Sequence, residues 1–199
     1  MIETKEDLRY YIECDRLANG VKNETFLKRV FQSLSPNLIV SFLVSLRNAE
    51  YYHNSKRICW LRRFVGGDYR LRLRHLSYKL GYSIPINVFG PGLSLPHFGT
   101  IVVNSKARVG KNCRLHVCTN IGASAGKPGA PIIGDNVYIG PGAILFGNIT
   151  IANNVTIGAN ATVNKSIEEK NVVIAGTPAK IVKENFPNWV VFNKVSSLL

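Results

Sequence analysis

The stretch IGDNVYIGPGAILFGNITIANNVTIGANATV, residues 133–163, repeats an aliphatic residue every six positions. The repeated residues are Ile133, Ile139, Leu145, Ile151, Ile157 and Val163, and an earlier run comprises Val103, Val109, Leu115 and Ile121. A helix has a period of 3.6 residues and a strand a period of 2, so neither gives this pattern. A period of six predicts a parallel β-helix, in which three sides close one coil and the repeated side chain points inward.

The sequence predicts a mainly β protein with an α-helical N-terminal region. Residues 1–80 are expected to be helical and basic, and residues 81–182 to form the β-helix. The Gly- and Pro-rich segment 122–132 interrupts the repeat, so it is predicted to leave the solenoid as a loop. Residues 183–199 are expected to form a tail that caps the exposed strand edges.

Within the N-terminal region, helix starts are predicted at Thr4, Asn23 and Ser35. Residues 56–79 hold eight Lys and Arg side chains and a single acid, interleaved with apolar residues, which predicts a basic amphipathic helix broken at Gly66-Gly67. Such a helix contacts a membrane surface or an anionic polymer, or it is simply a solvated face. We do not expect nucleic-acid binding, because no motif that reads nucleic acid accompanies the charge.

Composition narrows the class of protein further. The net charge is +13, the first residues are polar rather than leader-like, and the longest apolar run, residues 38–46, is too short to span a bilayer. The four cysteines lack the spacing of a zinc site, so no metal is predicted. These features predict a cytoplasmic protein, with the inner face of the membrane as a second option.

Two histidines are candidate site residues. His97 lies six residues before Val103, where an inward aliphatic residue is expected, and it stands near Pro96 and Gly99. A single histidine is more often structural, but this one breaks the repeat near a corner, which favours a catalytic role. His116 follows 19 residues later, about one coil, so both rings are expected near the same edge. A contact with the acceptor is predicted for His116.

Five segments together resemble the serine acetyltransferase branch of the hexapeptide acyltransferases. They are SLPHFGTIVV (94–103), NIGASAGKPGAP (120–131), IGDNVYIGPGAILFGNITI (133–151), IGANATV (157–163) and AGTPAKIV (175–182). The resemblance implies a left-handed coil, a homotrimer with active sites between subunits, and acetyl-CoA as donor. It also implies that His97 is the general base that takes the proton of an acceptor hydroxyl as the oxygen attacks the thioester, a role that suits histidine.

The same resemblance implies a set of donor-binding residues. Backbone amides at the start of the loop would meet the pantetheine and the thioester oxygen, small residues would let the arm lie on the solenoid wall, and lysines would meet the adenosine phosphates. The set is Gly122, Ala123, Ser124, Gly140, Pro141, Gly147, Ala159, Lys180 and Lys183.

The acceptor side departs from that branch. The acid expected about fifteen residues before the histidine is missing from the stretch Tyr82–Pro85, an acid expected just before it is Pro96, and an Arg-His pair is replaced by Gly129-Ala130. Tyr82 is predicted to contact the acceptor instead. A site without these charges would hold serine poorly. The leading interpretation is therefore an acetyl-CoA-dependent O-acetyltransferase that modifies a sugar hydroxyl of a surface polysaccharide or its precursor. The alternatives are a serine O-acetyltransferase and a non-catalytic trimeric scaffold.

Overall fold

The computed structural model describes residues 1–21, 37–55 and 60–192. Within these residues, three helices precede the solenoid: α1 (Lys5–Ala18), α3 (Leu38–Asn54) and α4 (Trp60–Leu80). The start of α1 is the predicted one, because Thr4 and Asp7 form a capping box. Asn37 caps α3. The starts predicted at Asn23 and Ser35 lie outside the described residues.

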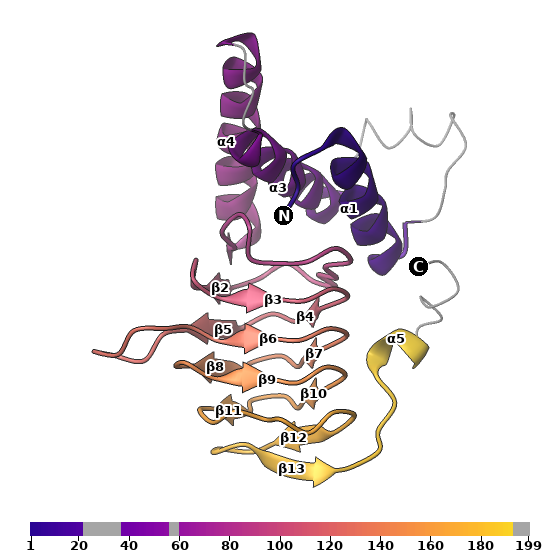
Figure 1. Cartoon of the computed structure of the whole chain (residues 1–199), viewed down its shortest axis with the longest axis vertical. Coiled ribbons are helices and arrows are strands. Elements are labelled where there is room, and N and C mark those ends of the chain that lie inside the picture. Colours follow the sequence, from indigo (N-terminus) through magenta and orange to yellow (C-terminus); the bar gives the residue numbers. More distant parts are fainter. Residues whose placement is uncertain (22–36, 56–59, 193–199) are drawn as a thin grey trace.

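Thirteen short strands follow the helices, and they confirm the predicted β-helix. They are β1 (Tyr82–Ser83), β2 (Ile101–Val103), β3 (Arg108–Val109), β4 (Arg114–Leu115), β5 (Thr119–Gly122), β6 (Ile132–Ile133), β7 (Tyr138–Ile139), β8 (Ile144–Phe146), β9 (Thr150–Ile151), β10 (Thr156–Ile157), β11 (Thr162–Val163), β12 (Val173–Ala175) and β13 (Lys180–Lys183). They form three sheets, ordered β1-β2-β5-β8-β11, β3-β6-β9 and β4-β7-β10-β12-β13. All pairs are parallel except β12 with β13. The chain winds from sheet to sheet as a left-handed coil, an exception to the usual right-handed crossover (Figure 1).

The repeated aliphatic residues fill the interior of the prism. Ile139, Leu145 and Ile157 have no exposed surface, and the small residues at the second inward position, such as Ala143, are equally buried. One corner is held by a ladder of asparagine side chains, each donating to the next at 2.9 Å. Its members are Asn112, Asn136, Asn154 and Asn171, and all have φ between 55° and 61°. Asparagine tolerates this left-handed conformation, so the ladder serves the turn and the stacking of coils together.

The predicted break at Gly66-Gly67 is wrong, because α4 continues through both glycines. The reason lies in the packing of α4 on α3. A Cβ atom on Gly66 would lie 2.9 Å from Cβ of Tyr52, whereas nothing lies within 4 Å of the same position on Gly67. Gly66 therefore allows the two helices to approach closely, and the helix tolerates its lower propensity.

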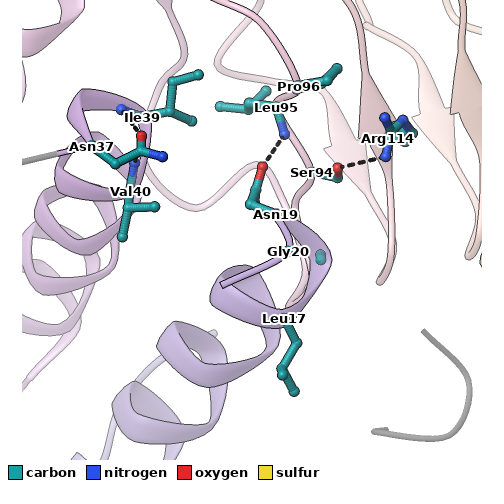
Figure 2. Close-up of a pocket in the computed structure, with 11 residues that line it drawn as sticks. Leu17, Asn19, Gly20, Asn37, Ile39, Val40, Ser94, Leu95, Pro96 and Arg114 are labelled. Atoms are coloured by element: carbon teal, nitrogen blue, oxygen red, sulfur yellow. Dashed lines mark hydrogen bonds between the residues drawn. The ribbon is translucent and has the colours of Figure 1, made fainter. Parts of the chain in front are cut away.

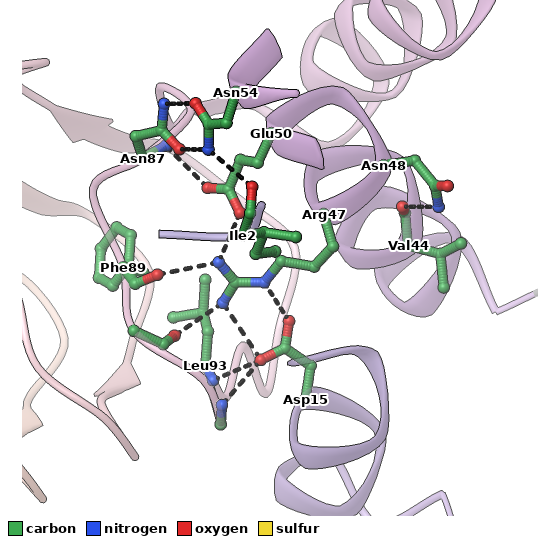
Figure 3. Close-up of polar contacts among 12 residues, drawn as sticks. Ile2, Asp15, Val44, Arg47, Asn48, Glu50, Asn54, Asn87, Phe89 and Leu93 are labelled. Carbon is green, nitrogen blue, oxygen red and sulfur yellow. Dashed lines mark hydrogen bonds and ion pairs between the residues drawn. The ribbon is translucent and has the colours of Figure 1, made fainter. Parts of the chain in front are cut away.

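A buried ion cluster joins the helices to the first coil (Figure 3). Nε of Arg47 on α3 lies 2.7 Å from a carboxylate oxygen of Asp15 on α1, and Nη1 lies 3.0 Å from Glu50. The guanidinium also donates to the carbonyl oxygens of Phe89 and Gly90, at 2.9 and 2.8 Å. Burial alone would lower the pKa of Arg47, but the adjacent Asp15 and Glu50 carboxylates raise it above its ordinary value. Arginine thus stays charged while fully buried.

Asp15 extends the same cluster into the chain that leads to His97. One of its oxygens accepts hydrogen bonds from the backbone N–H groups of Gly92 and Leu93, both at 2.9 Å. Asn19, one turn later, donates to the carbonyl of Leu93 and accepts from N–H of Leu95. The end of α1 is therefore fixed to residues 92–95 through main-chain contacts.

The far end of the solenoid is closed by β13, which runs antiparallel to β12. The chain then turns back along the side of the solenoid, where α5 (Trp189–Phe192) lies beside it (Figure 1). Trp189 is buried, donates to the carbonyl of Asn112 at 2.8 Å, and packs with Ala18 of α1. Within the described residues, no helix is long and apolar enough to cross a membrane.

Candidate active site

The corner that carries His97 is two residues longer than the corner one coil further on. Ser94 is paired with Arg114, and Val102 with Asn120, so these pairs fix the ends of both corners. The first corner has two more residues between its ends, and the excess pushes it out of the prism. His97 is consequently exposed, although its place in the repeat is one for an inward side chain.

Tyr82 supports this corner from the inside. Its hydroxyl donates a 2.6 Å hydrogen bond to the carbonyl oxygen of His97, and its ring packs edge-to-face on Phe42 with centroids 5.0 Å apart. Burial raises the pKa of Tyr82 to about 12, so the hydroxyl remains a donor at neutral pH. Tyr82, predicted as an acceptor contact, is buried and has its hydroxyl bonded to the main chain of His97.

His116 lies beside His97, as the spacing of one coil predicts. The ring centroids are 6.1 Å apart, and Tyr138 lies 4.9 Å from His116 on another side. Burial, followed by the charges of Arg114 and His97, lowers the pKa of His116 to about 4. The His116 imidazole is therefore neutral at pH 7.

A cavity of about 390 Å³ opens next to this corner, between the end of α1, the start of α3 and the first coil (Figure 2). Pro96, Arg114 and Asn19 are among the residues that line it. Arg114 lies 3.4 Å from the hydroxyl of Ser94 and stands over the ring of Trp189. The sequence gives no signal for this cavity, because its walls come from elements that meet only when α1 docks on the solenoid.

The residues predicted to bind acetyl-CoA at the start of the loop lie together at another corner, where β5 and β8 end. N–H of Gly147 donates to the carbonyl of Gly122 at 3.2 Å. Gly147 has a φ of 94°, and a Cβ atom there would lie 3.1 Å from Oγ of Ser124. Ala123 is exposed between them. Gly122, Ser124 and Gly147 are therefore neighbours across two coils, and only glycine suits the last position.

Gly140, Pro141 and Ala159 lie on the corner of the histidines, one and two coils further along. A Cβ atom on Gly140 would lie 2.8 Å from the backbone nitrogen of Ala159, so glycine is required there by coil stacking alone. Pro141 and Ala159 are exposed. Lys180 and Lys183 are also exposed, but they lie on β13, at the opposite end of the solenoid from His97.

Apart from Tyr82, Lys180 and Lys183, the predicted site residues thus occupy two corners that flank one sheet, β1-β2-β5-β8-β11. The histidines stand at one corner, and the start of the loop stands at the other. The sheet between the two corners therefore separates the His97 imidazole from the small residues Gly122, Ser124 and Gly147.

Residues 130–165 match the family described as bacterial transferase hexapeptide (six repeats). Serine acetyltransferase 1, chloroplastic, of Arabidopsis thaliana is 40% identical over 100 residues, which are 48% of this chain and 32% of that protein. The serine acetyltransferase of Staphylococcus xylosus is 38% identical over 98 residues, covering 48% of this chain and 45% of the relative. The chain therefore spans less than half the length of these two relatives.

Solved structures extend the similarity to most of the chain. Serine acetyltransferase from Brucella abortus strain S19 has a TM-score of 0.61 at 26% identity and covers 92% of this chain and 70% of its own. The same enzyme in complex with coenzyme A gives a TM-score of 0.63 at 25% identity, covering 92% of this chain and 69% of its own. The predicted resemblance to the serine acetyltransferase branch is confirmed.

Proposed function

We propose that the protein is an acetyl-CoA-dependent O-acetyltransferase in which His97 is the general base. The observation that carries the proposal is the longer corner, which places the His97 imidazole outside a solenoid of transferase hexapeptides. The named relatives are serine acetyltransferases, and one of them has been solved with coenzyme A. Retention of the histidine and of the small residues along the sheet argues against a purely structural scaffold.

The reaction needs one proton acceptor and one oxyanion site. His97 takes the hydroxyl proton of the acceptor while the oxygen attacks the thioester carbonyl carbon; the C–S bond then breaks, and the proton passes to the CoA thiolate. Backbone N–H groups at Gly122–Ser124 would stabilise the negative charge on the carbonyl oxygen. The exposed Pro141 and Ala159 would contact the pantetheine arm, and Lys180 and Lys183 the phosphates.

For the acceptor, the relatives favour serine over the sugar hydroxyl that the sequence pattern predicts. One specific observation keeps the saccharide as a second candidate. Gly129 has a φ of 104°, and a Cβ atom there would lie 2.8 Å from Asn148, so this position has no room for a carboxylate-binding side chain. Ala130 beside it is buried. The end of the loop thus lacks a charged group for an amino acid.

A homotrimer is the proposed assembly. Apolar side chains are exposed on the sheet between the two corners, including Val102 and Ile144, and Phe98 beside His97 is 75% exposed. Neighbouring copies would cover such a face. A sedimentation coefficient of a 22.0 kDa monomer at micromolar concentration would contradict this assembly.

We also propose that α4 contacts an anionic acceptor. Arg70 and Arg74 line a groove of about 530 Å³ between α4 and β1, and Tyr78 forms part of the same wall. Arg72 is exposed on the same helix. Guanidinium groups beside an exposed aromatic ring suit a carboxylated or phosphorylated saccharide better than a neutral one.

CoA release with acetyl-CoA and a panel of free serine, nucleotide sugars and acidic polysaccharide tests the proposal. Turnover should depend on an acceptor, and His97→Ala should lower kcat by ~10²–10⁴-fold with little change in the KM for acetyl-CoA. Efficient turnover with serine would exclude the saccharide. Near-normal turnover of His97→Ala would show that the base has been misassigned.

A further inference from the structure

One buried polar atom next to His97 lacks a partner. Nε2 of His116 has no hydrogen bond to any residue that the structure describes. Buried polar atoms are almost always paired, so an unpaired one is a candidate for a further hydrogen bond. The main chain of His116 is already held, since its N–H donates to Ile139 at 3.1 Å and its carbonyl accepts from Thr119 at 2.7 Å. The atom of His116 that is left without a hydrogen bond is therefore Nε2 of the ring.

The neighbours of His116 leave His97 as the natural partner. Tyr138 offers a ring face at 4.9 Å, and the Arg114 guanidinium is engaged with the Ser94 hydroxyl and the ring of Trp189. The His97 ring, 6.1 Å away and tilted by 50°, has both a donor and an acceptor nitrogen when neutral. Two hydrogen-bonded imidazoles have nitrogens about 3 Å apart and centroids about 5 Å apart, so a shift of about 1 Å joins them. His97 is exposed and has room to move.

His97 has no other orienting group in the described part of the chain. Both ion pairs found there belong to the Arg47 cluster, and no carboxylate contacts the His97 ring. Its support comes from Tyr82, which holds the carbonyl and leaves the imidazole free to rotate. A general base needs a fixed orientation, and its hydrogen bonds are often long before substrate binds.

We propose that His116 is a positioning residue for His97, and that its Nε2 pairs with the His97 imidazole when the acceptor binds. The inference rests on the proposed function, in which His97 is the base. The neutral His116 imidazole would then orient the general base through a hydrogen bond, a role that a carboxylate fills more often. Because burial lowers the pKa of His116 to about 4, the ring remains neutral through the working pH range and does not repel a protonated His97.

Kinetics of His116→Leu and His116→Gln test the pairing, with His75→Leu as the control because His75 is exposed on α4. The leucine variant should lose kcat by roughly 10- to 100-fold, since a base displaced by about 1 Å loses that much. The KM for acetyl-CoA should stay within about twofold, and glutamine, which keeps a hydrogen-bonding group, should retain more activity than leucine. Equal kcat for wild type and both variants would overturn the proposal.

A second measurement does not depend on turnover. In ¹⁵N NMR of the imidazoles with free serine present in excess, the Nε2 resonance of His116 should shift and the pKa of His116 should rise in His97→Ala, because that variant removes a neighbouring ring. An unchanged resonance would show that the rings do not interact and would overturn the pairing. Wild-type protein without any CoA release would refute the proposed function instead, and the NMR result would still decide whether the rings interact.

Discussion

Replacing Arg47 by methionine should be one of the most damaging single substitutions in the helical layer. Methionine keeps the apolar stem but removes all five N–H donors, which bond Asp15, Glu50 and two carbonyl oxygens of the first coil. Both carboxylates would stay buried, with side chains exposed by 1% and 3%. Removing one partner of a buried ion pair costs about 3–5 kcal/mol. For a chain of this size, that corresponds to a fall in Tm of roughly 6–20 °C.

Urea and thermal unfolding followed by circular dichroism would measure the effect, with Arg72→Met as the matched control. Arg72 is exposed, so its substitution should change the free energy of unfolding by less than about 0.5 kcal/mol. Asp15→Asn should cost less in the Arg47→Met background than alone, with a coupling of about 0.5–3 kcal/mol, because the uncompensated charge is gone. Added salt should leave the coupling nearly unchanged, since a buried pair is weakly screened. Equal stability of the two arginine variants, or strict additivity in the cycle, would refute the reasoning.

The remaining predictions concern the site and its supports. Tyr82→Phe should lower kcat by roughly 2- to 12-fold through loss of one buried hydrogen bond, with the KM for acetyl-CoA unchanged. A fall in kcat together with an equal rise in that KM would instead indicate general misfolding. Gly67→Ala should stabilise α4 by up to about 1 kcal/mol in urea unfolding, whereas Gly66→Ala should be less stable than it by about 1–3 kcal/mol, and reversed order would contradict the helix packing. The lowered pKa of His116 means that the unfolded chain binds its proton first, so stability should fall between pH 6.5 and about 4, and less so in His116→Gln. The KM for the acceptor should rise with added salt, and it should rise less after the arginines of residues 70–74 are neutralised. A KM that does not respond to salt would show that this face of α4 is solvated and does not bind the acceptor.

The solenoid was predictable because each coil is encoded locally. An aliphatic residue every six positions gives the sides, and Leu145 and Ile157 are buried where the repeat places them. The proximity of His97 and His116 followed from the length of one coil.

Other features depend on contacts that no local pattern records. The extra length of the His97 corner is visible only once Ser94 and Val102 are paired with the next coil. The continuity of α4 depends on Tyr52, which lies on another helix. The pairing of Arg47 with Asp15 joins residues 32 positions apart. Charge and propensity along the chain predict none of these partners.

The antiparallel return of β13 has a consequence for how copies of the protein meet. A parallel β-helix with two open ends would offer matching strand edges, and copies would stack end to end into fibrils. Here α3 and α4 cover one end, and a reversed strand bounded by Lys180 and Lys183 closes the other. The short edge of β13, flanked by two lysines, disfavours the addition of a further strand, so association is directed to the flat sides.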